Sequence, residues 1–261
     1  MKNIIKIIYF INFVILSLEN FLFNGENMIF AAILAGGTGI RMGNVDKPKQ
    51  FLFLGNKPII IHTIEKFYIN PNFDKIIVLC PKQWINYTKD LINKYIIDNK
   101  NIIVIEAGNV RNETIMKAIN YIESNFSINS EDIIVTHDSV RPFVTHKIIE
   151  DNINAAIKYG ACDTVIPASD TIVQSLNGQF VSDIPNRVNM YQGQTPQSFK
   201  ILKLKELYNK LSNNEKSILT DAAKIFIMND EDVFLVNGEV TNIKITYPYD
   251  LKVANSILKE E

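Results

Sequence analysis

The sequence has 261 residues and a formal net charge of −1, which argues against a nucleic-acid-binding protein because no excess of basic side chains is available for phosphate contacts. Its hydrophobic content of 47% is ordinary for a globular protein and allows one large or two small domains. The two cysteines, Cys80 and Cys162, lie far apart without metal-ligand spacing, so we expect buried thiols in a reducing cytoplasm.

The segment 1–27 is a candidate N-terminal extension. Basic residues precede an apolar run at 7–18, as in a signal peptide or a short anchor. The run is short for a membrane-spanning helix, contains Asn12, and precedes no small-residue cleavage site. Met28 stands directly before the first predicted strand, so we expect the working protein to start there. A disordered or peripheral extension is the second interpretation, and secretion is the least favoured.

The stretch that follows predicts a binding loop for a polyphosphate. An apolar run at 29–34 indicates a buried strand. It leads into a loop that carries glycines and basic side chains: Gly36, Gly37, Gly39, Arg41 and Lys49. Glycines let backbone N–H groups approach an anion, and the basic side chains add positive charge. A tight turn with solvated charges is the alternative. The glycine spacing fits neither a dinucleotide-binding fingerprint nor a Walker loop.

Strand-like and helix-like segments then alternate along the chain. Strands are predicted at 75–80, 101–105, 132–136 and 162–166, and helices at 58–69, 83–96, 111–124 and 147–159. Apolar strands separated by helices predict an α/β, Rossmann-like fold, with a mostly parallel sheet and helices on both faces. Ligands of such sheets bind beyond the carboxyl ends of the strands. The glycine loop, residues 108–114 and residues 138–141 all fall there.

Residues 168–190 interrupt this alternation. The short β-prone segments 171–173 and 179–181 flank Asn177-Gly178, which is a strong hairpin signal. A lone hairpin is only marginally stable, so we expect a protruding arm that packs against a second copy of the chain. A flap over the site is the alternative.

Further elements follow the arm, after a polar segment at 192–196. They are helices at 199–211 and 221–228, strands at 233–236 and 242–245, and a final helix from Pro248. No internal repeat or low-complexity linker is present, so we expect a single domain over 28–261 with the arm attached to it.

Asp138 follows the fourth predicted strand of the sheet. A carboxylate beside a phosphate-binding loop is a natural Mg²⁺ ligand, because Mg²⁺ typically takes one or two carboxylates together with substrate phosphates. The alternative is that Asp138 pairs with Arg141 or caps the next turn. Four other polar residues near predicted strand or helix ends are, on spacing alone, more typical of surface or capping positions: Arg187, Thr195, Thr220 and Lys244.

Together, the motifs resemble the cytidylyltransferases of sugar-alcohol phosphates, from Met28 to the C terminus. The resemblance is carried by LAGGTGIRMG with PKQ, RNET, HDSVRP, DIP-R, QGQTPQ, LTDA and NIKIT. It implies a sheet of the nucleotide-diphospho-sugar transferase type. One branch of these enzymes forms CDP-ribitol from CTP and D-ribitol 5-phosphate, for cell-surface polymers such as teichoic acids or capsules. The other branch forms CDP-methylerythritol in isoprenoid biosynthesis.

The motifs HDSVRPF, MYQGQTPQSF and LTDAAKIF are more similar to the ribitol branch. We therefore expect D-ribitol 5-phosphate as the acceptor, with 2-C-methyl-D-erythritol 4-phosphate as the alternative. The resemblance also implies a cytoplasmic homodimer joined through the arm, and a ribulose-5-phosphate reductase in the same pathway.

The resemblance implies a role for each matching position. The CTP-binding residues would be Leu34, Ala35, Gly36, Gly37, Gly39, Gly108, Asn109 and Thr114. The catalytic residues would be Arg41, Lys49 and Arg187, and Asp138 would bind Mg²⁺. The acceptor-binding residues would be Thr171, Arg187, Thr195, Thr220 and Lys244, with Arg187 reaching the neighbouring subunit. The sequence departs from the family pattern at Ile40, where Thr is frequent, and at Ala107-Gly108-Asn109, where Gly-Gly-acid is usual.

Overall fold

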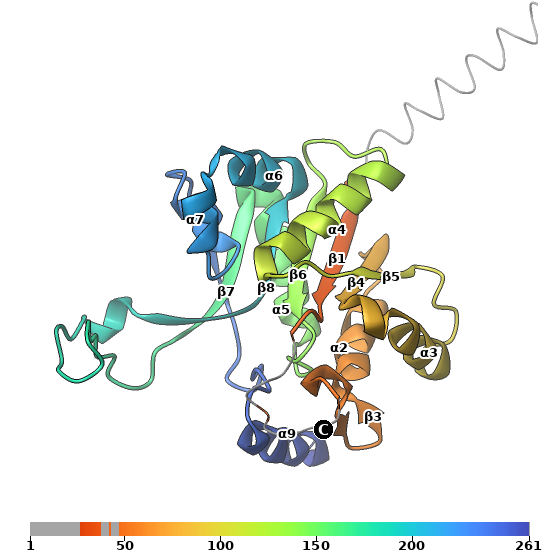
Figure 1. The fold of residues 1–261 in the computed structure, drawn as a ribbon, viewed down its shortest axis with the longest axis horizontal. Coiled ribbons are helices and arrows are strands. Elements are labelled where there is room, and N and C mark those ends of the chain that lie inside the picture. Colours follow the sequence, from red (N-terminus) through yellow and green to blue (C-terminus); the bar gives the residue numbers. More distant parts are fainter. Residues whose placement is uncertain (1–26, 38–41, 43–46, 261) are drawn as a thin grey trace, which may run out of the picture.

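The computed structural model describes residues 27–37, 42 and 47–260, which form a central sheet flanked by helices (Figure 1). The strands of the main sheet are β1 (Ile29–Leu34), β4 (Lys75–Cys80), β5 (Ile102–Glu106), β6 (Ile133–Asp138), β7 (Ala161–Pro167), β8 (Tyr191–Lys200) and β9 (Phe234–Asn237). The helices are α2 (Ile59–Tyr68), α3 (Ile85–Tyr95), α4 (Arg111–Asn125), α5 (His146–Tyr159), α6 (Ile201–Lys210), α7 (Asn213–Ser217), α8 (Ala223–Ile227) and α9 (Pro248–Glu260). A small hairpin, β2 (Phe53–Leu54) and β3 (Lys57–Pro58), and short 3₁₀ turns complete the described elements.

The described part of the sheet has seven strands in the order β5-β4-β1-β6-β8-β7-β9. Within it β8 alone runs antiparallel to its neighbours, β6 and β7. The chain moves outward from β1 to β4 and β5, then returns to β6 on the other side of β1. Two loops therefore diverge where β1 and β6 end, and α/β sheets bind ligands at such a reversal of strand order. Leu34 and Asp138 pair in register at that point.

The two faces of the sheet are covered by different helices, as the sequence predicted. Ala31 and Ile33 of β1 pack into a core with α2, α3 and α5. Phe30 and Ala32 point to the opposite face and pack with α4, α6 and α8. Side chains alternate across a strand, so an unbroken apolar strand such as β1 requires cover on both sides. The mostly parallel α/β fold is confirmed.

Local sequence signals set both ends of α5. The Thr145 hydroxyl accepts a hydrogen bond from the backbone of Ile148 at the start of α5. Gly160 follows the last turn with a φ of +84°, in the left-handed region that ends many helices and favours glycine. The predicted helix at 147–159 is confirmed to within one residue.

The arm protrudes from the body, at the left of Figure 1, but the two strands predicted within it are wrong. Its ladder is reduced to one isolated bridge between Gln174 and Asp183. Between them, the Asn177 side chain accepts hydrogen bonds from the backbone of Gln179 and Phe180. The local side-chain bonds replace ladder bonds because, among the described residues, no second layer covers the arm.

A strand predicted at 242–245 is also wrong, and this segment has irregular structure. Its polar groups bond to residues 140–141 and to β8 instead of to a neighbouring strand. The polar segment 192–196 is part of β8, which delays the following helix to Ile201.

Cys80 and Cys162 are both buried and form no disulfide, as predicted. Burial raises the pKa of the Cys162 thiol to about 12. The candidate extension lies outside the described residues except for residue 27. Of the helices that the structure does describe, none combines the length and the apolar character needed to cross a membrane.

We predict that Asp163→Asn stabilises the protein in a pH-dependent way. Burial raises the pKa of the Asp163 carboxyl to about 6 from 3.8, although the Gln197 amide donates to it at 3.0 Å. The folded state therefore binds the proton more tightly than the unfolded state, and ionisation of Asp163 destabilises the fold at neutral pH. Asparagine keeps the acceptor oxygen and should raise the free energy of unfolding by about 2 kcal/mol above pH 6.

The gain should shrink towards zero as the pH falls from about 6 to about 4, measured by urea unfolding across that range. The exposed Asp90→Asn serves as the control and should change little. A gain that is the same at every pH would contradict this assignment.

Candidate active site

A cavity of about 380 Å³ opens at the carboxyl ends of β1 and β6. It brings together nine of the residues that the resemblance assigned to the site or its loop: Leu34, Gly36, Gly37, Lys49, Gly108, Asn109, Thr114, Asp138 and Lys244. It also contains residues that were given no role: Gln50, Val110, Arg111, Ser139 and Val140. Segments far apart in the sequence therefore meet at one place. Ala35 is buried directly after the end of β1, next to Gly36.

One wall of the cavity is the turn that leads into α4. Thr114 accepts a hydrogen bond from the backbone N–H of Gly108 and donates to the carbonyl of Val110, each at 3.0 Å. The Glu113 carboxylate accepts from the backbone N–H of Asn109 at 2.9 Å. A Cβ atom on Gly108 would lie 2.6 Å from that of Glu113, so only glycine fits this turn. The N terminus of α4 thereby faces the cavity, a favourable place for an anion.

Another part of the lining is Lys49, in a buried 3₁₀ turn at Lys49–Phe51. The side chain of Gln50 ties this turn to the glycine loop by donating to the carbonyls of Ala35, at 2.7 Å, and Gly37, at 3.0 Å. Phe51 packs against Trp84, with ring centroids 5.0 Å apart. Both contacts hold Lys49 at the edge of the glycine loop. Gly39 and Arg41 lie outside the described residues.

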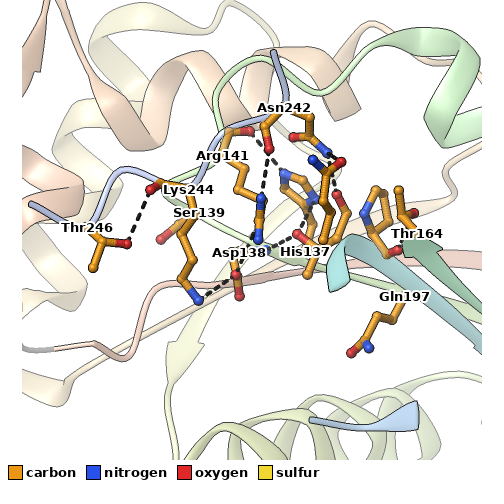
Figure 2. Close-up of polar contacts among 12 residues, drawn as sticks. His137, Asp138, Ser139, Arg141, Thr164, Gln197, Asn242, Lys244 and Thr246 are labelled. Carbon is orange, nitrogen blue, oxygen red and sulfur yellow. Dashed lines mark hydrogen bonds and ion pairs between the residues drawn. The ribbon is translucent and has the colours of Figure 1, made fainter. Parts of the chain in front are cut away.

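Asp138 is the centre of a cluster of charges (Figure 2). One oxygen, Oδ2, lies 2.9 Å from Nζ of Lys244 and 3.6 Å from Nε of Arg141. The other, Oδ1, lies 3.7 Å from Nη2 of Arg111. Burial alone would raise the pKa of the Asp138 carboxyl, but Arg111, Lys244 and Arg141 together hold it well below its usual range. The cluster keeps an excess of positive charge, which suits binding of phosphates.

The structure fits the expected role of Asp138 as a Mg²⁺ ligand only in part. Oδ1 of Asp138 lies 3.7 Å from Nη2 of Arg111, which is beyond hydrogen-bond distance. No group of three or more His, Cys, Asp or Glu side chains that could hold a metal occurs among the described residues. A single carboxylate binds Mg²⁺ together with phosphate oxygens. The donor set therefore fits an ion that enters with a phosphate-bearing substrate.

His137 and Thr195 lie directly beneath Asp138. Nε2 of His137 lies 3.1 Å from the Arg141 carbonyl, and its Nδ1 lies 2.9 Å from the Thr195 hydroxyl. Burial lowers the pKa of His137 to about 4, so the ring is neutral at physiological pH. The Thr195 hydroxyl also accepts from the backbone N–H of Asp138 at 3.2 Å. The resemblance predicted that Thr195 binds the acceptor. In the structure, its hydroxyl is already hydrogen-bonded to His137 and to the backbone of Asp138, and so it supports the site.

Three other predicted residues do not line this cavity. Thr171 and Arg187 are exposed at the base of the arm, and Arg187 donates to the carbonyl of Ser169 at 3.0 Å. Thr220 is exposed beside Asp221, whose carbonyl faces the side chain of Asn112 at 3.4 Å.

The sequence contains a signal for a functional role of Arg111. Arg111 is the first residue of α4, where the positive end of the helix dipole disfavours a cation. Its Nη1 atom is buried without a hydrogen-bond partner in the described structure. A positive side chain at this helix end makes physical sense when an anion binds next to it. The PKQ motif likewise contained Gln50, whose role depends on a loop that is adjacent only in the folded chain.

Residues 29–260 match the family model described as IspD, 2-C-methyl-D-erythritol 4-phosphate cytidylyltransferase. The structure is similar to 2-C-methyl-D-erythritol 4-phosphate cytidylyltransferase from Francisella tularensis, with 29% identity and a TM-score of 0.74 over 88% of this chain and 99% of that one. It is also similar to 4-diphosphocytidyl-2C-methyl-D-erythritol synthase from Anaerococcus prevotii, with 27% identity and a TM-score of 0.73 over 90% and 97% of the two chains. The bifunctional IspDF of Campylobacter jejuni matches at 25% identity and a TM-score of 0.68, over 87% of this chain and 54% of that one.

We predict that Asp138→Asn destabilises the protein and makes its stability depend on anions. Removing the carboxylate leaves three neighbouring cations without their common partner. The loss should be about 2–3 kcal/mol, below the value for a fully buried pair because Lys244 is 40% exposed. Inorganic phosphate should recover part of this loss, relative to chloride at equal ionic strength.

Thermal and urea unfolding in the two buffers measure both effects. Asp132→Asn is the matched control, because Asp132 is also buried but accepts from the backbone of Met28 and Asn129. It should lose stability without any phosphate effect. The same phosphate effect in both variants would overturn the prediction.

Proposed function

The chain belongs to the 2-C-methyl-D-erythritol 4-phosphate cytidylyltransferase (IspD) family, and on that premise we propose that it transfers a cytidylyl group from CTP to the phosphate of a small polyol. The observation that carries the proposal is the two-sided cavity. Gly36, Gly108 and the N terminus of α4 form a wall that suits a nucleotide. Lys49, Asp138 and Lys244 supply the charged wall where two anionic reactants would meet.

In the proposed reaction, a phosphate oxygen of the acceptor attacks the α-phosphorus of CTP. The bond from that phosphorus to the bridging oxygen breaks, and pyrophosphate leaves in line. The nucleophile is already deprotonated, so no general base is needed. The main barrier is repulsion between two anions, which Lys49 would reduce, with Arg41 added by the family resemblance. When bound at Asp138, Mg²⁺ would supply further charge neutralisation on the phosphate oxygens.

Two acceptors are supported by different observations. The motifs HDSVRPF, MYQGQTPQSF and LTDAAKIF favour D-ribitol 5-phosphate, which is the acceptor expected from the sequence. The matched family and the solved structures are named for the methylerythritol enzyme, so the comparisons favour 2-C-methyl-D-erythritol 4-phosphate over ribitol. Both are small polyol phosphates, and the same charged wall would bind either phosphate. The assay described below therefore decides which of the two polyol phosphates is the acceptor.

We further propose that the enzyme works as a cytoplasmic homodimer whose arm serves the partner's site. Thr171 and Arg187 lie on the arm, away from the cavity of their own chain. The arm also exposes large apolar side chains, with Leu176 84%, Phe180 72% and Val188 79% accessible. Exposed apolar clusters of this kind mark protein interaction surfaces. A second copy seated on the arm would bury them and bring Arg187 to a cavity.

Incubation of the purified protein with CTP, Mg²⁺ and each acceptor tests the function, with pyrophosphate release as the readout. We expect release with one of the two polyol phosphates, and CDP-ribitol as the product if the sequence motifs identify the acceptor. ATP, GTP and UTP in place of CTP are the controls. Failure to release pyrophosphate with either acceptor would refute the proposed function.

Mixing two single variants tests the shared site. Lys49→Ala should lower kcat by roughly 10²-fold, and Arg187→Ala should mainly raise KM for the acceptor. In a mixed dimer, the Arg187→Ala subunit keeps Lys49 and receives an intact Arg187 from its partner. Co-expressed variants should therefore regain roughly a quarter of wild-type activity at low acceptor concentration, since half of the dimers carry one intact site. Activity no higher than the mean of the two variants would show that each chain uses its own Arg187.

A further inference from the structure

The segment 239–246 carries Lys244 across the site without forming a strand or a helix. The Lys244 side chain is 40% exposed, and its Nζ lies 2.9 Å from Asp138. Lysine has high rotamer entropy, so its backbone must be held firmly if the ammonium group is to bind a substrate in one place. On one side of Lys244, Ile245 is buried and its backbone N–H donates to the carbonyl of Val140 at 2.9 Å.

On the other side of Lys244, four buried residues form a closed ring of hydrogen bonds (Figure 2). The Asn242 amide donates to the carbonyl of Thr195 at 2.9 Å, and the Thr195 hydroxyl lies 2.9 Å from Nδ1 of His137. Nε2 of His137 lies 3.1 Å from the carbonyl of Arg141, whose Nη1 donates to the carbonyl of Asn242 at 2.7 Å. The ring joins the end of β6, the middle of β8 and the segment that carries Lys244.

The direction of each bond in the ring follows from the atoms involved. The Arg141 carbonyl can only accept, so Nε2 of His137 carries the proton and Nδ1 accepts from the Thr195 hydroxyl. The Asn242 amide faces two acceptors, the Thr195 carbonyl and Oε1 of Gln194, the latter at 3.1 Å. Its nitrogen must therefore point to them, since the reverse orientation would place three acceptors together. A donor pair is required at position 242.

We propose that Asn242 is a positioning residue, which closes this ring and thereby sets the distance between Lys244 and Asp138 for binding of the acceptor phosphate. The inference rests on the proposed function for the identity of that phosphate. Asn242 is fully buried and does not line the cavity, so it acts through Lys244 and Arg141 and not by touching the substrate. None of the four ring residues belongs to the nucleotide wall, which is built from Gly36, Gly108 and the N terminus of α4.

Asn242→Asp is the decisive variant, because it keeps the shape of the side chain and replaces the two donated hydrogens by a carboxylate facing two acceptors. We expect KM for the acceptor to rise at least 10-fold while KM for CTP stays within about twofold. The matched control is Asn152→Asp. Asn152 is also fully buried and donates to Thr164 at 2.8 Å, but its side-chain bonds join α5 to β7 and β8 and not to the segment that carries Lys244. It should lose stability and keep both KM values.

A second readout, the chemical reactivity of Lys244, does not depend on catalytic activity. Limited acetylation of lysines, followed by peptide mass spectrometry, should show Lys244 reacting faster in Asn242→Asp than in the wild type, with no change in Asn152→Asp. If Asn242→Asp does not fold, Asn242→Ser replaces it with the same expectations, because serine keeps one donor and introduces no charge. Equal acceptor KM values and equal Lys244 labelling in wild type and variant would overturn the proposal. A wild-type protein that releases no pyrophosphate would refute the proposed function instead, and the labelling result would still decide the role of Asn242.

Discussion

The structure depends on one buried carboxylate that is shared by three cations. Asp138 stands where β6 ends, and Arg111, Arg141 and Lys244 reach it from three different parts of the chain. A buried charge is costly unless it is paired, so each cation stabilises the carboxylate and the carboxylate limits repulsion among the cations. The surplus positive charge faces the cavity. In our proposal, a phosphate binds there without rearranging the fold, which is the preorganisation that phosphoryl and nucleotidyl transfer require.

The antiparallel strand β8 packs next to this cluster and supports it through hydrogen bonds. It enters between β6 and β7 and carries a row of buried polar side chains to the centre of the sheet: Gln194, Thr195, Gln197 and Ser198. Several of them bond across segments, as when Thr195 holds the backbone of Asp138 and His137 at once. Hydrogen-bonded networks in a low-dielectric interior are rigid when they are satisfied. The buried polar side chains of β8 and the apolar cores on each face of the sheet therefore give the site a fixed shape.

The two halves of the cavity are built in different ways. In our proposal, the nucleotide half comes from the glycine loop after β1 and the turn before α4, whose bonds join residues only a few positions apart. The acceptor half needs long-range contacts, such as Lys244 with Asp138, and in our proposal a partner's arm. Family membership consequently supports the cytidylyl donor more firmly than the polyol that receives the group.

The sequence by itself determined the alternation of strands and helices and the end of α5 at Gly160, and it predicted chemical roles for the glycine loop, Lys49 and Asp138. These features depend on hydrophobic period, glycine conformation and charge within short windows. Tertiary structure alone decided that Arg111, Arg141 and Lys244 meet at Asp138, that 242–245 is not a strand, and that the arm lacks its two predicted strands. The physical reason is that these outcomes depend on partners such as Arg141 and Asn242, which lie 101 positions apart and become neighbours only when the sheet forms.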